Sequence, residues 1–280
     1  RRGRGEAAGG RQRRGQQVRK ADDFRDSWVT PVSPYLNALK GGCALETLEL
    51  GPRLRAIADL VPTGCRCLAD VGTDHGYIPA ALLLEGRVEQ AVAADVGALP
   101  LEHARRTAQR LGLDASIDFR LGDGLTVLSP GEADVIIIAG MGGDNIVSIL
   151  SAAPWARKGL LLQPMSRAEV LRRWLTENGY AVEAERLVQD KGVIYPILTV
   201  GSGDVPPASP VEAWGGLLLA HDPLWGSYLE ERILRLRKAA AGLARARDPA
   251  LACRQAEFLR IAGELETRRE EWTRANRTGD

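Results

Sequence analysis

Two aspartates and two glycines alternate within residues 68–83, LADVGTDHGYIPAALL, where an apolar run passes into a turn and then into a helical pattern. The acids are Asp70 and Asp74, and the glycines are Gly72 and Gly76. Because the glycines are four residues apart, the turn differs from the G-x-G-x-x-G motif that binds dinucleotides, and Asp74 would repel a pyrophosphate. An acidic turn instead favours a ligand with a positively charged end, such as an amino acid or a sulfonium. S-adenosylmethionine carries both groups.

The ends of three later apolar segments carry residues that suit the rest of a nucleotide. Asp95 closes AVAAD, where a carboxylate can accept hydrogen bonds from both ribose hydroxyls. Asp123 follows IDFRLG and can accept one from an adenine amino group. Gly140, Gly142 and Gly143 follow VIIIA and leave open backbone for a substrate base. An aspartate after a strand is often only a helix cap or a turn former, but acid or glycine at four successive strand ends favours a nucleotide-type cofactor.

The elements that must position these residues alternate at short intervals. Continuous apolar runs predict strands, and amphipathic periodicity predicts the helices between them. We expect strands at 65–72, 89–96, 116–124, 133–143 and 158–164, and helices at 47–62, 77–86, 99–113, 144–154 and 166–179. Ser166 and Glu169 are expected to form a capping box. Segments 180–188 and 193–200 predict a closing antiparallel hairpin. The fold class is therefore doubly wound α/β, with a mainly parallel sheet covered on both faces.

The C-terminal part is expected to be a helical hairpin. Residues 201–210 have the composition of a linker, and from Trp225 the chain turns helical in two pieces divided at Asp248–Pro249. Apolar residues recur at coiled-coil spacing in both pieces, which is typical of antiparallel partners. The two sets are Leu229, Ile233, Leu236, Ala240 and Leu243, and Leu251, Phe258, Leu265 and Trp272. The sequence leaves open whether this hairpin only packs on itself or also grips a substrate.

The net charge of +1 conceals three regions of different sign. Residues 1–20 carry a net of +7, residues 21–224 a net of −9, and residues 225–280 a net of +3. A polyanionic partner would therefore be held at the two ends of the chain. On the hairpin the candidates are Arg232, Arg235, Lys238, Arg245 and Arg254. A solvated helix face on which these cations pair with glutamates would have the same composition.

Residues 1–46 are predicted to form a disordered basic tail, because the opening stretch is rich in Arg, Gly and Gln and lacks apolar periodicity. This tail could be a nucleic-acid-binding arm or only a solvated extension.

No apolar run approaches the roughly 18 residues of a membrane span. The cysteines lack the usual zinc spacing. We therefore expect a cytoplasmic monomer that binds neither a membrane nor a metal ion.

Four segments in this order, DVGTDHGYIP, GDGL, IAGMGG and LLLQP, followed by a helical hairpin, resemble the bacterial tRNA (adenine-22-N1)-methyltransferases. The resemblance covers residues 47–275. It implies a class I methyltransferase domain at 47–203 that uses S-adenosylmethionine, and a linker with a coiled-coil hairpin at 204–280 that helps to hold tRNA. Two positions depart from the family pattern, since Asp95 stands where Glu is usual and Met165 where Asn is usual. The Arg-rich tail has no counterpart in that pattern.

The resemblance also implies roles for single residues. The methionine part of the cofactor would be lined by Asp70, Gly72, Thr73 and Asp74. Asp95 would bind the ribose, Asp123, Gly124 and Leu125 the adenine, and Val96 and Gly140 would complete the cofactor site. The substrate base would meet Met141, Gly142, Gly143, Gln163 and Pro164, and the tRNA backbone would meet the five basic hairpin residues.

Methylation at N1 of adenine needs few catalytic groups. Neutral N1 has a lone pair that can attack a sulfonium methyl directly, so the protein must align the two and stabilise the cationic product. Asp74 and His75 are candidates for that task and Tyr77 for stacking, although His75 could instead only stabilise the turn. Base pairing buries N1, so the target must be flipped or unpaired. An adenine-N6 enzyme usually has Asn/Asp-Pro-Pro-aromatic where this chain has residues 140–143, which argues against N6.

Two other functions are compatible with the same pattern. A small-molecule methyltransferase would share the cofactor site but would have little use for a basic hairpin. A non-catalytic nucleotide-sensing or RNA-binding protein could have kept the pocket without the reaction. We expect incubation with labelled cofactor and tRNA to separate the three.

Overall fold

The centre of the fold is a seven-stranded sheet with the strand order β3-β2-β1-β4-β5-β7-β6. The computed structural model describes residues 48–244 and 248–277, which belong to one compact unit, so the predicted tail lies outside the described residues. Strand β7 is antiparallel to both of its neighbours, and the other neighbouring pairs are parallel. The doubly wound α/β class with a closing antiparallel hairpin is therefore confirmed.

The observed elements follow the predicted order closely. The strands are β1 (Cys67–Val71), β2 (Gln90–Asp95), β3 (Ile117–Leu121), β4 (Val135–Gly142), β5 (Leu160–Ser166), β6 (Tyr180–Asp190) and β7 (Val193–Ser202). The helices are α1 (Pro52–Asp59), α2 (Tyr77–Leu84), α3 (Ala98–Leu111), the 3-10 helix η4 (Gly124–Val127), α4 (Gly143–Ala152), α5 (Ala168–Glu177), α6 (Pro210–Gly215), α7 (Trp225–Leu243) and α8 (Pro249–Arg277). None of the helices in the described part of the chain combines the length and the apolar character that a membrane span requires.

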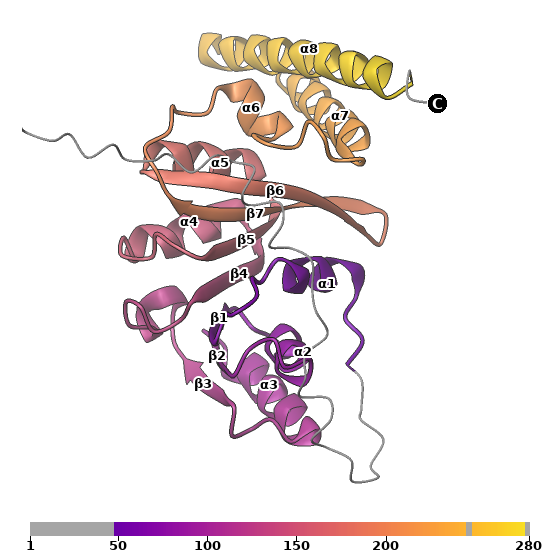
Figure 1. Cartoon of the computed structure of the whole chain (residues 1–280). Helices are drawn as coiled ribbons and strands as arrows, with labels where there is room; N and C mark the ends of the chain where they lie inside the picture. Colours follow the sequence, from indigo (N-terminus) through magenta and orange to yellow (C-terminus); the bar gives the residue numbers. More distant parts are fainter. Residues whose placement is uncertain (1–47, 245–247, 278–280) are drawn as a thin grey trace, which may run out of the picture. The chain divides into compact units, whose positions relative to one another are not determined.

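Helices cover both faces of the sheet, with α1, α2 and α3 on one face and α4 and α5 on the other (Figure 1). Strand β4 shows why its sequence is apolar throughout. Val135 and Ile137 belong to the core under α1, α2 and α3, whereas Ile136 and Ile138 belong to the core under α4 and α5. Because both faces of a central parallel strand are buried, the strand reads as a continuous apolar run.

Two local expectations are corrected. Ser166 does not cap α5, because β5 continues through this residue, and α5 begins after Arg167, whose φ of 55° places it in the left-handed region without a side-chain cap. A capping box does form at α6, where the segment expected to be a linker ends. There the Glu212 backbone N–H donates to Ser209 Oγ over 3.3 Å, and the Ser209 N–H donates to the Glu212 carboxylate over 2.9 Å.

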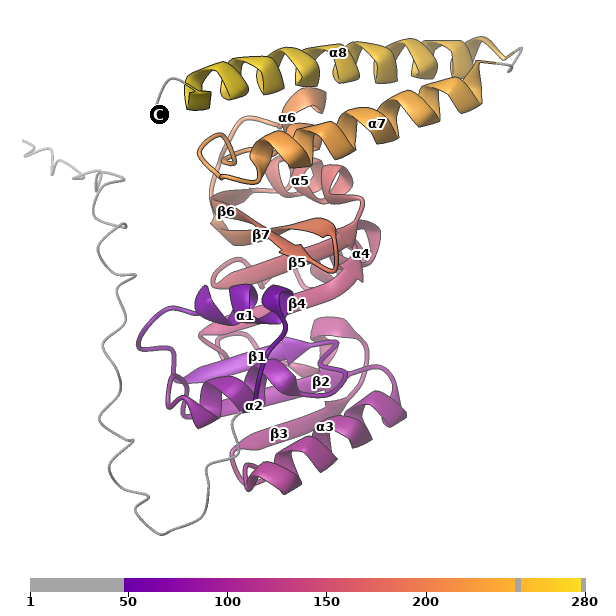
Figure 2. The same ribbon diagram turned by 90° about the vertical axis from the view of Figure 1, so that its right-hand side faces the viewer.

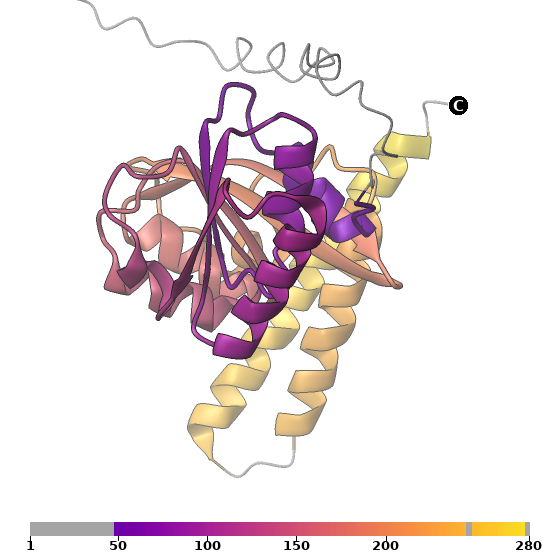
Figure 3. The ribbon, with the colours of Figure 1, turned by 90° about the horizontal axis from the view of Figure 1, so that it is seen from below.

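Helices α7 and α8 lie side by side in opposite directions, as Figures 2 and 3 show. Arg237 pairs with Glu266 over 2.6 Å and Arg269 with Glu230 over 3.4 Å, so residue numbers rise along α7 as they fall along α8. The antiparallel helical pair is therefore confirmed. Its core also takes in side chains from β6 and β7, so the pair packs on the sheet as well as on itself.

A buried guanidinium ties the helical pair to the sheet. Arg172 of α5 has no exposed side-chain surface and donates from Nε to Glu185 Oε1 on β6 over 2.6 Å. Its Nη1 donates to the Ala213 carbonyl of α6 over 2.7 Å and to the Tyr228 hydroxyl of α7 over 3.1 Å. One side chain thus joins four elements, and this fixes how α7 stands against the edge of the sheet.

Candidate cofactor and substrate site

The turn after β1 begins at a glycine, Gly72, whose backbone is in a left-handed conformation that other residues rarely adopt. Gly72 has a φ of 78°, and a Cβ built on it would lie 2.2 Å from the Met141 methyl carbon. Its N–H donates to the Ala94 carbonyl of β2 over 2.8 Å. The turn therefore lies between the carboxyl ends of β2 and β4. The strand order reverses between β1 and β4, and ligands of open α/β sheets bind at such a switch point.

Asp70 is buried beneath this turn. The Thr73 hydroxyl donates to its carboxylate over 2.8 Å. Burial raises the pKa of Asp70 to about 6, the Thr73 hydrogen bond partly opposes this shift, and the negative charge of Asp95 adds to it. Such a carboxylate is poorly solvated when it is charged, so a positively charged ligand group nearby would stabilise it. That this side of the site receives a cation stays a prediction.

A cavity of about 250 Å³ opens at the carboxyl ends of β1, β2 and β4. Its walls include six of the predicted site residues: Gly72, Asp95, Val96, Asp123, Gly124 and Met141. The carboxylate of Asp95 accepts from the Gly97 N–H over 2.8 Å and, more weakly, from the Asp74 N–H over 3.4 Å. Each of its oxygens therefore has capacity for a further donor, as the ribose role requires.

Five other cavity residues were not identified from the sequence: Val71, Gly122, Asn145, Ser148 and Ile149. The last three lie on one side of α4, immediately after the glycines of β4. Ser148 and Ile149 follow Asn145 by three and four residues, so helical spacing in the sequence could have indicated that they share a face. In contrast, the Leu125 side chain is buried in the core between the sheet and α4 and does not line the cavity. Only its backbone remains for the predicted contact with adenine.

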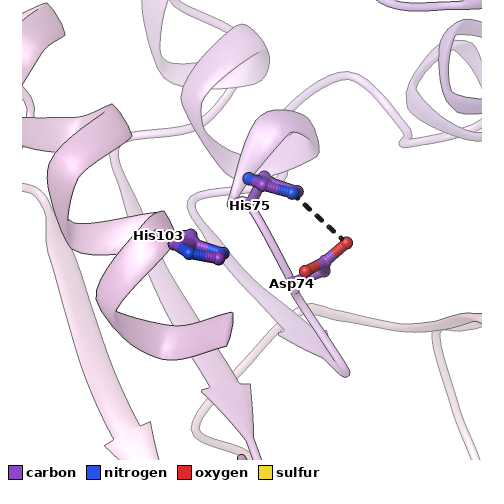
Figure 4. A group of neighbouring side chains, drawn as sticks. All are labelled: Asp74, His75 and His103. Carbon is purple, nitrogen blue, oxygen red and sulfur yellow. Dashed lines mark ion pairs between the residues drawn. The ribbon is translucent and has the colours of Figure 1, made fainter. Parts of the chain in front are cut away.

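Two of the candidate catalytic residues, Asp74 and His75, lie close together on the turn after β1, with His103 of α3 beside them (Figure 4). These residues and Tyr77 are called the rim. Asp74 has a φ of 50°, and 67% of its side chain is exposed. Its carboxylate is 3.7 Å from His75 Nε2. The His75 ring stacks on Tyr77, with 5.1 Å between ring centroids, and on His103 of α3, with 5.0 Å. His103 was not expected from the sequence, and it makes the rim a stack of three rings.

Asp74, His75 and His103 are also the group, among the described residues, whose ligand atoms could approach one metal ion, since these atoms lie within 4.8 Å of one another. The planes of the two imidazoles differ by only 7°. Because nitrogen lone pairs lie in the ring plane, stacked parallel rings do not aim them at one shared point. The arrangement is that of a packed aromatic stack, and the use of no metal stays a prediction.

The glycines that follow β4 differ in how open they are. A Cβ on Gly140 would come no closer to another residue than 3.9 Å, to Arg53 Nη1. A Cβ on Gly142 would meet Ser166 Oγ at 3.4 Å, whereas one on Gly143 would lie 2.2 Å from the Arg167 carbonyl oxygen. Gly140 therefore fits the expectation of open backbone, and Gly143 contradicts it because its open side is filled by the start of α5.

Gln163 and Pro164 are buried at the end of β5, so neither presents its side chain at the surface. The Gln163 amide is fully engaged, since its Oε1 accepts from Arg53 Nη1 over 2.7 Å and from the Gly140 N–H over 3.2 Å, while Nε2 donates to the Pro164 carbonyl over 3.0 Å. The expectation that these two side chains bind a base directly is therefore wrong. The neighbouring Met165 is exposed.

The basic residues of the helical pair separate into three groups. Arg235, Lys238 and Arg254 are exposed, and the Arg254 guanidinium lies 5.4 Å from the centre of the Phe258 ring. Arg232 is buried, with its guanidinium 4.7 Å from the centre of the Tyr228 ring, so its expected place on an RNA-binding surface is wrong. Arg245 lies outside the described residues.

Both the sequence and the fold are similar to those of known proteins. Residues 50–198 match the family model for a methyltransferase domain. The tRNA (adenine(22)-N(1))-methyltransferase of Bacillus subtilis is 35% identical over 199 residues, which cover 69% of this chain and 81% of that protein. The crystal structure of the B. subtilis m1A22 tRNA methyltransferase matches with a TM-score of 0.70 at 29% identity, over 78% of this chain and 99% of the other. A Streptococcus pneumoniae protein in complex with S-adenosyl-L-methionine matches with a TM-score of 0.66 at 29% identity, over 76% and 97% of the two chains.

Proposed function

This chain belongs to the family of the Bacillus subtilis tRNA (adenine(22)-N(1))-methyltransferase, and from that premise we propose that it transfers a methyl group from S-adenosylmethionine to N1 of an adenine in tRNA. The observation that carries the proposal is the cavity at the β1–β4 switch point, with Asp95 on its wall and the acidic turn beside it, where the Asp74 N–H donates to Asp95. We take adenine 22 as the target because the B. subtilis relative bears that position in its name.

The residues present suit this cofactor chemically. Asp95 can accept from ribose hydroxyls, and Asp123 and Gly124 line the same cavity and could receive the adenine ring. Asp70, buried beneath the turn after β1, would favour a cationic group of the ligand near that turn. When bound, S-adenosylmethionine supplies an electrophilic methyl group on a sulfonium.

The chain's own contribution to the reaction would be orientation and charge. Adenine N1 attacks through an existing lone pair, so no residue has to remove a proton to create the nucleophile. Asp74, exposed at the rim, would favour the positive charge that passes to the adenine. Tyr77 is 37% exposed and stacks on His75, so its ring can support a flipped base.

We also propose that the exposed Arg235, Lys238 and Arg254 hold the tRNA backbone, and that the protein works as a monomer in the cytoplasm. The test of the function is incubation of the purified protein with radiolabelled S-adenosylmethionine and bulk bacterial tRNA, with a nucleoside mixture as the competing acceptor. Label in tRNA as 1-methyladenine is the expected result. Label in free nucleosides alone would indicate a small-molecule enzyme, and cofactor binding without transfer would indicate a non-catalytic protein.

Asp95→Ala is expected to weaken S-adenosylmethionine binding by roughly 1.5–3 kcal/mol, the range for hydrogen bonds to a charged group. Isothermal titration calorimetry measures the change directly. Asp114→Ala is the matched control, because Asp114 is exposed and is not among the residues that line the cavity. An unchanged affinity in the Asp95 variant would contradict the assignment of Asp95 to the ribose hydroxyls.

Cofactor affinity is expected to depend on the protonation of Asp70. Because the pKa of its carboxyl is raised to about 6, the group is charged at neutral pH and becomes neutral as the pH falls through 6. Its attraction for the ligand ammonium is then lost, and affinity should fall by up to about tenfold per pH unit below that value. Titration with S-adenosylhomocysteine at a series of pH values measures the profile. Asp70→Asn should flatten it, and an equal slope in that variant would assign the pH dependence to another group.

A further inference from the structure

The guanidinium of Arg53 lies at the carboxyl end of β4, although no motif in the sequence indicated this residue. Arg53 belongs to the first turn of α1, and its Nη1 donates to Gln163 Oε1 over 2.7 Å. The same Nη1 lies 3.9 Å from the place where a Cβ of Gly140 would be. The next residue, Met141, lines the cofactor cavity. The Arg53 guanidinium therefore lies close to the open backbone of Gly140, at the edge of the sheet where we expect the substrate nucleotide to approach.

Gln163 holds this guanidinium in one orientation. Its side chain is fully buried, and turning its amide over would break the hydrogen bonds from Arg53 and Gly140 to Oε1 as well as the one from Nε2 to the Pro164 carbonyl. A buried amide with all of these partners rarely turns, because each lost bond leaves a polar group unsatisfied. The buried glutamine thus acts as a fixed support for Arg53.

The positive charge of Arg53 is not neutralised by any residue that the structure describes. Its hydrogen-bond partner, Gln163, is a neutral amide, and Arg53 makes no other hydrogen bond or ion pair within the described part of the chain. Arg55, two residues along the same helix, differs in this respect because it is bound by Asp59 and Glu85. A guanidinium has five N–H donors, and Arg53 uses its Nη1 group to donate to Gln163. Its other N–H groups can therefore bind an anion.

We propose that Arg53, held by Gln163, binds a phosphodiester group of the RNA substrate next to the target adenine. This inference rests on the proposed function. A phosphate is favoured over the adenine ring as the ligand, because methylation at N1 makes the ring cationic and a neighbouring guanidinium would disfavour that product. Planar guanidinium groups match phosphate oxygens in geometry. A phosphate held beside the site would also help to keep an unpaired or flipped nucleotide in place.

The experiment measures tRNA affinity as a function of salt concentration for the full chain and three variants. Arg53→Met is expected to weaken binding roughly 10- to 100-fold, the effect of losing one charged hydrogen-bonding partner. It should also reduce the slope of log K against log salt by about 0.7–0.9, the value for one phosphate contact. Arg53→Lys should restore the slope while recovering only part of the affinity, since an ammonium keeps the charge and loses the paired geometry.

Arg55→Met is the matched control on the same helix and should leave both the affinity and the slope unchanged. The affinity for S-adenosylhomocysteine should be the same in all variants, which separates a phosphate contact from a disturbed cofactor site. Weaker binding with an unaltered slope would overturn the phosphate assignment, and unaltered binding would overturn any role in RNA contact. If the wild type itself does not bind tRNA, the proposed function fails first, so the two failures are distinguishable.

Discussion

Asp74→Asn is expected to lower the single-turnover rate of adenine methylation about a hundredfold, which corresponds to a loss of ~3 kcal/mol of transition-state stabilisation. The substitution keeps the size of the side chain and one acceptor oxygen, and removes the negative charge that would favour positive charge on the adenine. Folding should be unaffected, because Asp74 is mostly exposed and its φ of 50° lies in the left-handed region that asparagine adopts as readily as aspartate.

The comparison of thermal midpoint with methylation rate decides between the two roles of this carboxylate. If the Asn variant melts early and methylates normally when folded, Asp74 only braces the turn. His75→Ala provides the neighbouring comparison. His75 lies in the stack between Tyr77 and His103, so its loss should loosen the rim and cost less in rate than the loss of the Asp74 charge.

Arg172→Met should destabilise the protein by about 3–5 kcal/mol, the cost of removing one partner from a buried ion pair. Glu185 would keep its charge in a fully buried place, and among the described residues the remaining donors to its carboxylate are the backbone N–H groups of Leu217 and Leu218, at 2.7 and 3.1 Å. The hydrogen bonds to Ala213 and Tyr228 would also disappear, so the contact between α5 and α7 would loosen. Chemical denaturation measures the free energy of unfolding.

The double variant Arg172→Met/Glu185→Gln should recover much of this loss, because a neutral glutamine still accepts from the two N–H groups without a buried charge. Arg106→Met serves as the surface control. Arg106 pairs with Glu102 over 2.9 Å with 70% of its side chain exposed, so its loss should cost less than about 1 kcal/mol. Equal effects of the two single substitutions would show that the Arg172 pair has no special part in holding the helices.

Because Arg172 is buried against α7, removal of the helical pair would also disturb the rest of the fold. The core that contains Tyr228, Leu229 and Leu265 includes Leu187 of β6 and Ile194 of β7. Deletion of residues 225–280 would therefore expose part of the sheet's own core and strip a partner from Arg172. Substitution of the exposed cations Arg235, Lys238 and Arg254 is the cleaner way to test RNA binding by this part of the molecule.

The order and type of the main elements could be predicted because strands buried on both faces leave continuous apolar runs, as in β4. Caps were harder, since Ser166 and Glu169 have the spacing of a capping box but Ser166 remains in β5. The prediction that Arg232 lies on an RNA-binding surface was wrong for another reason. Helical spacing marks the seam between α7 and α8, but it does not show that α7 also packs on the sheet. That packing widens the buried face, and Arg232 lies within it against Tyr228 of the same helix.

The cofactor side of the site was predictable because its residues follow strand ends, and parallel strands bring those ends to one edge. The substrate side was less so. Arg53 and Gln163 are 110 residues apart, and no periodicity connects them. Gln163 was expected to contact the base because the family resemblance implied it, and only the fold shows that its amide faces Arg53 and Gly140.

The central claim is transfer of a methyl group to N1 of one adenine in tRNA, and position-resolved mapping tests it most directly. N1 lies on the Watson–Crick edge, so its methylation blocks pairing and stops reverse transcription at the modified base. A tRNA transcript with adenine at position 22 and the same transcript with guanine there form the matched pair. We predict a cofactor-dependent stop at position 22 of the first transcript and none in the second, with loss of the stop in Asp74→Asn at short times. Label incorporated at N6, or equal incorporation into both transcripts, would contradict the account.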